Sequence, residues 1–265
     1  MTQTTALITG ASSGIGALYA DRLAHRGHDL ILVARNAAKL EALALRLRQE
    51  TGRQVETLPA DLADPEALRR IAARLREDPA IGMLVNNAGS AIAAPVLASD
   101  PDRLEAMVQL NVIAATRLAQ AAAAGFVARG GGTLVNIASV LGLAPERFNA
   151  VYAATKAYVL ALTQGLNAEL AGRNIRVQAV LPGATRTALW EAAGIDVATL
   201  PPEMVMEADE MVEAALAGLD MGELVTLPSL PDMAAWEAAD AARQALGPDL
   251  SHRHAAARYR PAAAA

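Results

Sequence analysis

The stretch Ala6-Leu7-Ile8-Thr9-Gly10-Ala11-Ser12-Ser13-Gly14-Ile15-Gly16 decides the fold of this chain. A short apolar run leads directly into a turn with three glycines, and a segment of helical periodicity follows. Glycines at such a turn let the backbone approach a pyrophosphate closely, and the N-terminus of the next helix offers free N–H groups. Many loops carry three glycines, so the strand before and the helix after are what indicate a dinucleotide-binding βαβ unit.

The same alternation of short apolar runs and helical segments continues along the chain. Strands are expected at Ala6–Thr9, Leu30–Ala34, Val55–Pro59, Met83–Asn86, Thr133–Ala138, Arg176–Leu181 and Leu224–Leu227. Helices are expected near 15–26, 37–50, 65–77, 101–128, 150–171, 203–218 and 231–245. Apolar runs without polar alternation are typical of strands that helices cover on both faces. The series predicts an α/β fold of Rossmann type, a doubly wound parallel sheet of about seven strands.

One domain accounts for most of the length. We expect residues 1–247 to form a single oxidoreductase domain, with a substrate lid near 186–206 and a helical extension at 231–246. Residues 248–265, which end in Arg-Pro-Ala-Ala-Ala-Ala, are expected to be a loose tail.

Composition excludes several classes of function. The chain has 23 basic and 28 acidic residues and only eight aromatic ones, which disfavours nucleic acid as a partner. It has no cysteine, and its four histidines lack the spacing of a metal site, so no metal is expected. No uninterrupted apolar run reaches the 18 or so residues that span a bilayer, and the N-terminus is polar. We therefore expect a cytoplasmic protein with no membrane partner.

A second motif lies in the helix expected at 150–171. The chain contains two lysines among its 23 basic residues, and one of them, Lys156, follows Tyr152 by four positions. On a helix this spacing brings both side chains to one face. An ammonium group is a compact charge that lowers the pKa of a neighbouring phenol toward working pH. The pair is a candidate proton donor and acceptor.

The end of the second expected strand indicates which dinucleotide fits. The sequence at 32–36 is Leu-Val-Ala-Arg-Asn and contains no acid. A carboxylate there would bond a free ribose hydroxyl, whereas an arginine accepts a 2′-phosphate. Arg35 therefore favours NADP(H) over NAD(H). Lys39, one helical turn further on, either adds to this phosphate site or is a solvated helix residue.

With both motifs placed, the chain resembles the short-chain dehydrogenase/reductase family, in its single-domain subclass, over residues 4–230. Five landmarks stand in the family's order: Thr-Gly-x-x-x-Gly-x-Gly at 9–16, Asp61, Asn-Asn-Ala-Gly at 86–89, Ser139 with Tyr152 and Lys156, and Pro-Gly at 182–183. The spacing of the glycines separates this subclass from the sugar-nucleotide epimerases, which share the Tyr/Lys pair.

The resemblance implies a catalytic set of Ser139, Tyr152, Lys156 and Asn111. Tyr152 would exchange a proton with the substrate oxygen while hydride moves to or from the nicotinamide. Ser139 would bond the same oxygen, and Asn111 would hold a water that relays protons to Lys156. The expected cofactor contacts are Gly10, Ser12, Ser13, Gly14, Ile15, Gly16, Arg35, Lys39, Asp61, Leu62, Asn86, Ala88, Gly89, Tyr152, Lys156, Pro182, Gly183, Thr185 and Thr187. Asp61 would accept from the adenine amino group or cap the helix at 65–77, although Asp64 before Pro65 fits the cap better.

The expected lid is mainly apolar, which points to an apolar ketone, aldehyde or secondary alcohol. Its apolar residues, with those of the loop before Tyr152, are Leu189, Trp190, Ile195, Val197, Leu200, Met204, Met206, Leu141, Leu143 and Phe148. The resemblance also implies a homodimer or homotetramer, formed through the helices expected at 101–128 and 150–171. Two alternatives stay open: an NAD-dependent alcohol dehydrogenase of the same fold, and a non-catalytic sensor that binds a dinucleotide.

Overall fold

The computed structural model describes residues 4–259 and divides into two compact units, Met1–Ser229 and Leu230–Ala265. The first unit carries all the strands of the large sheet, and the second carries one helix and two short turns.

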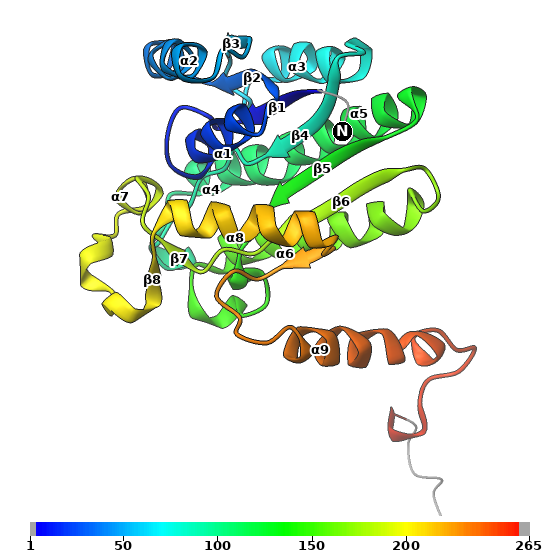
Figure 1. The fold of residues 1–265 in the computed structure, drawn as a ribbon. Helices are drawn as coiled ribbons and strands as arrows, with labels where there is room; N and C mark the ends of the chain where they lie inside the picture. Colours follow the sequence, from blue (N-terminus) through cyan, green and yellow to red (C-terminus); the bar gives the residue numbers. More distant parts are fainter. Residues whose placement is uncertain (1–3, 260–265) are drawn as a thin grey trace, which may run out of the picture. The chain divides into compact units, whose positions relative to one another are not determined.

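Seven strands form the sheet of the first unit, and every pair is parallel. Their order across the sheet is β3 (Val55–Pro59), β2 (Asp29–Ala34), β1 (Thr5–Thr9), β4 (Ile81–Asn86), β5 (Gly132–Ile137), β6 (Ile175–Val180) and β9 (Val225–Thr226). The order reverses direction between β1 and β4, as in a doubly wound fold (Figure 1). The expected Rossmann-type sheet is confirmed.

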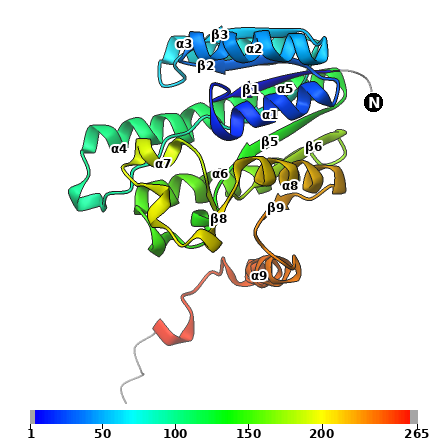
Figure 2. The same cartoon turned by 60° about the vertical axis from the view of Figure 1, so that its left-hand side comes forward.

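Helices cover both faces of this sheet (Figures 1 and 2). One face packs against α1 (Gly14–His25), α2 (Ala37–Thr51) and α8 (Ala208–Met221). The other packs against α3 (Pro65–Glu77), α5 (Ala115–Arg129) and α6 (Ala150–Glu169). Alternate residues of a strand serve the two faces: Ala6 and Ile8 belong to the first apolar cluster and Leu7 to the second. This double cover explains why the strand sequences are almost continuously apolar.

Local signals set where the helices begin. The Asp64 carboxylate accepts from the Ala67 N–H at 2.6 Å and caps α3, with Pro65 at its first position. Asp64 is therefore the cap, as its place before a proline predicts. Asn36 caps α2 in the same way by accepting from the Lys39 N–H.

The helical stretch 101–129 is continuous but not uniform. It consists of α4 (Pro101–Val108), a π-helical segment η2 (Gln109–Ala114) and α5. By length and composition this stretch is apolar enough to cross a membrane, but 56% of its most apolar window is buried, as in the core helix of a globular protein. Leu118 and Phe126 on α5, for example, are fully buried in the second apolar cluster.

The segment after β6 differs from the expected pattern. The helix expected from 203 begins at Ala208, because Pro201 and Pro202 lead into a single 3₁₀ turn, η6 (Pro202–Met204). Two short strands, β7 (Ala184–Thr185) and β8 (Val205–Met206), pair in parallel and close the base of the expected lid. Between them lie α7 (Leu189–Ala193) and η5 (Val197–Thr199). The Arg186 side chain donates to the Glu207 carboxylate at 2.7 Å beside this small sheet.

Three further 3₁₀ turns complete the first unit: η1 (Val96–Ala98), η3 (Val140–Gly142) and η4 (Pro145–Arg147). The second unit contains α9 (Ala234–Ala245), η7 (Gly247–Asp249) and η8 (Ala257–Tyr259). Of the expected domain and tail, residues 1–3 and 260–265 lie outside the described part of the chain.

Candidate active site

The expected site residues come together at the carboxyl edge of the sheet. The glycine turn follows β1, Ala88 and Gly89 follow β4, Ser139 follows β5, and Pro182 follows β6. In an open parallel sheet this edge, beside the point where the strand order reverses, is where ligands bind.

The glycine turn is held in one tight conformation. Gly10 and Gly14 have positive φ values of +66° and +54°, which a side chain would disfavour. A Cβ on Gly16 would lie 2.4 Å from the Gly10 carbonyl oxygen, so α1 starts directly against the end of β1. Ser13 makes no side-chain cap bond to α1, and no acid lies in the first turn of that helix. The N–H groups and positive dipole end of α1 therefore have neither a Ser13 cap nor a first-turn carboxylate.

Thr9 and Asn87, which belong to the two motifs but are not among the expected cofactor contacts, hold this turn to the loop after β4. The buried Thr9 hydroxyl accepts from the N–H groups of Asn87 and Ala88, both at 2.9 Å. The Asn87 side chain donates to the Thr9 carbonyl at 2.8 Å. The side chain of Asn86, by contrast, points into the core, where it donates to the Ala115 carbonyl and to the Asn136 side chain. The motif at 86–89 contains both asparagines, and only the structure separates their tasks.

Ser139, Tyr152 and Lys156 meet in a buried cluster. Each side chain belongs to a residue that is only 7% exposed. The Ser139 hydroxyl donates to the Pro182 carbonyl at 3.4 Å and accepts from the Leu141 N–H at 3.2 Å. The Lys156 Nζ lies 5.8 Å from the centre of the Tyr152 ring. Lys156 donates to the Ile137 carbonyl at 3.0 Å, which fixes its ammonium beneath the end of β5.

The pKa values of this pair correct one expectation. We expected the lysine to lower the pKa of the phenol, but burial raises the pKa of Tyr152 to about 12, against a smaller opposing effect of the Ser139 hydrogen bond. Burial also lowers the pKa of Lys156 to about 8. The physical reason is the same in both cases, since removal from water disfavours the charged form of each group. Tyr152 thus holds its proton at neutral pH.

Asn111 lies on the π-helical segment and is 2% exposed. Its side chain accepts from the Ser90 N–H and donates to the Ser90 carbonyl, both at 2.9 Å, and to the Thr155 hydroxyl at 3.1 Å. A Cβ on Gly89 would lie 3.2 Å from the Asn111 Oδ1 and 3.7 Å from the Lys156 Nζ. The glycine therefore leaves an opening between these two polar atoms.

The other expected cofactor contacts surround the glycine turn with different degrees of exposure. Arg35, Lys39 and Asp61 are exposed, and Leu62 is buried. The Pro182 carbonyl accepts from the Val140 N–H, and the Thr185 hydroxyl donates to the Gly183 carbonyl. A Cβ on Gly14 would lie 3.3 Å from the Thr187 methyl group, so the start of the lid touches the glycine turn.

An apolar wall surrounds Tyr152. It joins Ala91 and Ile92 from the loop after β4, Met107 from α4 and Ala193 from α7, with Leu141 and Phe148 packed against them. The expected Leu141 and Phe148 are part of this wall, whereas Ile92 and Met107 were missed. The apolar run at 91–94, directly after the Asn-Asn-Ala-Gly motif, is the signal that would have found Ile92.

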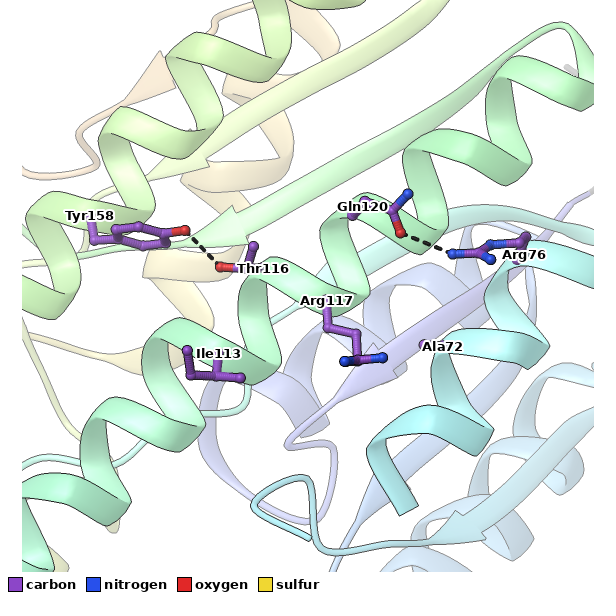
Figure 3. A pocket seen from close by; sticks show the side chains of 7 residues that line it. All are labelled: Ala72, Arg76, Ile113, Thr116, Arg117, Gln120 and Tyr158. Atoms are coloured by element: carbon purple, nitrogen blue, oxygen red, sulfur yellow. Dashed lines mark hydrogen bonds between the residues drawn. The ribbon is translucent and has the colours of Figure 1, made fainter. Parts of the chain in front are cut away.

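A separate pocket of about 410 Å³ opens on the outer face of α3, α5 and α6. Figure 3 shows Tyr158 bonded to Thr116, and Arg76 to Gln120, with Ile113 and Arg117 below these two pairs in the view. None of its lining residues belongs to the Tyr152 cluster or the glycine turn, so this pocket is not the candidate active site.

Comparison with known proteins finds relatives with the same fold. The family described as short chain dehydrogenase matches residues 4–197. The structure of a short-chain dehydrogenase from Sphingobium yanoikuyae in complex with NADPH superimposes with a TM-score of 0.94 at 56% identity, and covers 97% of this chain and 100% of its own. The bulky-bulky ketone specific alcohol dehydrogenase from Comamonas testosteroni gives a TM-score of 0.91 at 48% identity, over 98% of this chain and 100% of its own.

A human relative is more distant. The 17-beta-hydroxysteroid dehydrogenase type 3 of Homo sapiens is 31% identical over 213 residues, which are 80% of this chain and 66% of that protein. The chain thus spans just under two thirds of the length of this relative.

The tight contact at Gly16 can be tested by unfolding. Gly16→Ala should destabilise the protein by about 1–3 kcal/mol, because the new Cβ runs into the Gly10 carbonyl. Gly165→Ala is the matched control: this glycine lies within α6, and nothing lies within 4 Å of its added Cβ. Alanine there should stabilise by roughly 0.5–1 kcal/mol. Urea unfolding of both variants measures the difference, and a stabilising effect at both positions would contradict the close contact.

Proposed function

Because the chain belongs to the short-chain dehydrogenase family, we propose that it is an NADP(H)-dependent oxidoreductase that interconverts an apolar ketone and its secondary alcohol. The observation that carries this proposal is the cluster of three buried polar residues, Ser139, Tyr152 and Lys156, in which the Lys156 ammonium lies 5.8 Å from the centre of the Tyr152 ring. A sensor without turnover has no use for a buried lysine whose pKa is lowered, since burying that charge costs stability.

The residues at the carboxyl edge fit a dinucleotide. The positive φ values of Gly10 and Gly14 and the uncapped start of α1 suit a pyrophosphate, which needs close backbone N–H groups. Arg35 is exposed at the end of β2, where its guanidinium would meet a 2′-phosphate, and Lys39 is exposed nearby. The NADPH complex of the Sphingobium yanoikuyae relative supports the same cofactor.

Tyr152 is the proposed general acid and base. When bound, the cofactor supplies or accepts the hydride. In reduction, Tyr152 transfers its phenolic proton to the carbonyl oxygen, and its raised pKa keeps that proton available at neutral pH. The Ser139 hydroxyl donates to the same oxygen and stabilises the negative charge that develops there. The Lys156 ammonium would stabilise the phenolate that remains, and a water held by Asn111 would relay a proton to Lys156.

The proposed substrate is a ketone with sizeable apolar groups. The wall around Tyr152 is formed by apolar and aromatic side chains, and such a pocket binds by excluding water from apolar surface. The specificity stated for the Comamonas testosteroni relative, a bulky-bulky ketone, supports this class.

We also propose that the chain forms a homodimer or homotetramer through α5 and α6. Ile113 on η2, Val127 on α5 and Tyr158 on α6 have exposed fractions of 45%, 36% and 38%, and they would supply apolar surface to this contact. The cytoplasm stays the expected compartment.

Loss of the phenol tests the catalytic role. Tyr152→Phe should lower the rate of NADPH-dependent reduction of phenyl butyl ketone by about 10²- to 10⁴-fold, because it removes the proton donor and keeps the ring. NADPH fluorescence should still report binding by this variant. Retained turnover in this variant would contradict the assignment of Tyr152 as the proton donor.

In the wild type, kcat/KM should fall as the pH rises through about 8, because Lys156 then loses its charge.

Cofactor preference tests the role of Arg35. Arg35→Ala should weaken NADPH binding by roughly 10- to 100-fold and leave NADH binding nearly unchanged, because only the 2′-phosphate is lost as a partner. Titration with both cofactors, followed by nicotinamide fluorescence, gives the ratio. A wild type that prefers NADH would favour the NAD-dependent alternative, and one that binds neither would remove the basis of the enzyme proposal.

A charge on the α5–α6 face tests the assembly. The wild type should scatter light as a species larger than one 27.5 kDa chain, and Ile113→Lys should reduce it toward the mass of a single chain. Leu45→Lys is the control, since Leu45 is 53% exposed on α2, away from this face. A single-chain mass for the wild type would end this proposal.

A further inference from the structure

Asn149 begins the helix that carries Tyr152 and Lys156. It is 2% exposed, and its Oδ1 accepts from the N–H groups of Val151 at 3.0 Å and Tyr152 at 3.1 Å. The side chain thus caps α6 and holds the backbone of the tyrosine itself.

The other end of the same amide reaches a different part of the chain. The Asn149 Nδ2 donates to the Ala94 carbonyl at 2.6 Å and lies 3.4 Å from the Ser99 hydroxyl. Ser99 in turn donates to the carbonyls of Ala94 and Pro95. One buried side chain therefore joins the first turn of α6 to the segment 88–99, and both of its ends are satisfied.

The segment 88–99 contributes to the apolar cluster around Tyr152, which is the wall of the proposed substrate pocket. Ala91 and Ile92 are buried in the cluster that includes Tyr152. The Ala93 N–H donates to the Ala193 carbonyl of α7 at 3.2 Å, so this wall also holds the lid.

A second connection to the lid starts beside Asn149. The ring of the preceding residue, Phe148, meets the Tyr152 ring edge to face, with centroids 5.4 Å apart at 71°. It also meets the Trp190 ring of α7 at 6.2 Å and 85°. Two connections thus join the lid to the start of α6. One runs from the Ala193 carbonyl through residues 93–94 to the Asn149 amide. The other runs from Trp190 through the edge-to-face contact with Phe148, the residue before Asn149.

We propose that Asn149 is a positioning residue that sets the width of the apolar pocket beside Tyr152, an inference that rests on the proposed ketone-reductase function. Its cap fixes Tyr152, and its amide nitrogen fixes the facing wall, so a single side chain determines the distance between proton donor and wall. Without that nitrogen, the Ala94 carbonyl keeps only the Ser99 hydroxyl as a donor, and the part of the segment 88–99 around Ala94 loses its bond to the start of α6. A substrate that fills the pocket depends on this distance, and a small one does not.

Two variants remove the nitrogen and keep the cap. Asn149→Ser is neutral and shorter, whereas Asn149→Asp keeps the shape and adds a charge; serine and aspartate both cap helices well. The change that the two share is the loss of the donor to Ala94. Asp64→Ser is the matched control, because it alters the cap of α3, whose Asp64 has no part in the pocket.

The readout is selectivity for size. We expect kcat/KM for phenyl butyl ketone relative to that for acetone to fall at least tenfold in both Asn149 variants and to stay constant in Asp64→Ser. Hydrogen exchange provides a second readout that needs no turnover: amides of 88–99 should exchange faster in the Asn149 variants, and those of α3 should not.

Each outcome decides the proposal. An unchanged selectivity ratio in the Asn149 variants, or an equal change in Asp64→Ser, would reduce Asn149 to an ordinary helix cap and overturn it. If the wild type reduces no ketone with NADPH, the proposed function fails, and hydrogen exchange alone then decides whether Asn149 holds the wall: unchanged exchange in 88–99 overturns the inference.

Discussion

The site depends on one constraint, which is that the strands of the sheet run parallel and therefore end at the same edge. The ends of β1, β4, β5 and β6 bring the glycine turn, Gly89, Ser139 and Pro182 to neighbouring positions, although the first and last of them, Gly10 and Pro182, are 172 residues apart in the chain. Apolar clusters on both faces hold the strands in this arrangement. Hydrogen bonds at the strand ends, such as those of the Thr9 hydroxyl with the loop after β4, then set the finer spacing.

Burial, rather than mutual charge, dominates the electrostatics of the candidate active site. It raises the pKa of Tyr152 and lowers that of Lys156, so each group is shifted toward its neutral form. At neutral pH Tyr152 therefore carries its proton, as reduction requires, while the higher pKa also makes it a weaker acid. Alcohol oxidation needs the phenolate, and every pH unit below the pKa makes that form ten times rarer. The bound cofactor adds its own charge to this balance.

Sequence patterns predicted the sheet and most helices, because these depend on hydrophobic period and on short cap and turn motifs. The set of site residues that the motifs name stays a prediction. Sequence patterns could not separate Asn86 from Asn87, since both stand in one motif and only packing turns the first inward. The π-helical segment around Asn111 has the same apolar period as an ordinary helix, so it left no signal. The two-residue strands β7 and β8 are too short for any period to appear. Asn149 lies three residues before Tyr152, so a helix cap could be expected there. Its other partner is the backbone carbonyl of Ala94, 55 residues away, and a backbone group leaves no pattern in the sequence.

The scarcity of lysine has a practical consequence for labelling. Of the two lysines, Lys156 is 7% exposed and Lys39 is exposed at the start of α2. An amine-reactive dye applied to the folded protein would therefore attach at Lys39 rather than at Lys156, and the large arginine population would not react. A fluorophore on Lys39 lies one helical turn from Arg35. The native sequence thus already contains an attachment point for an optical reporter at the edge of the glycine-turn region.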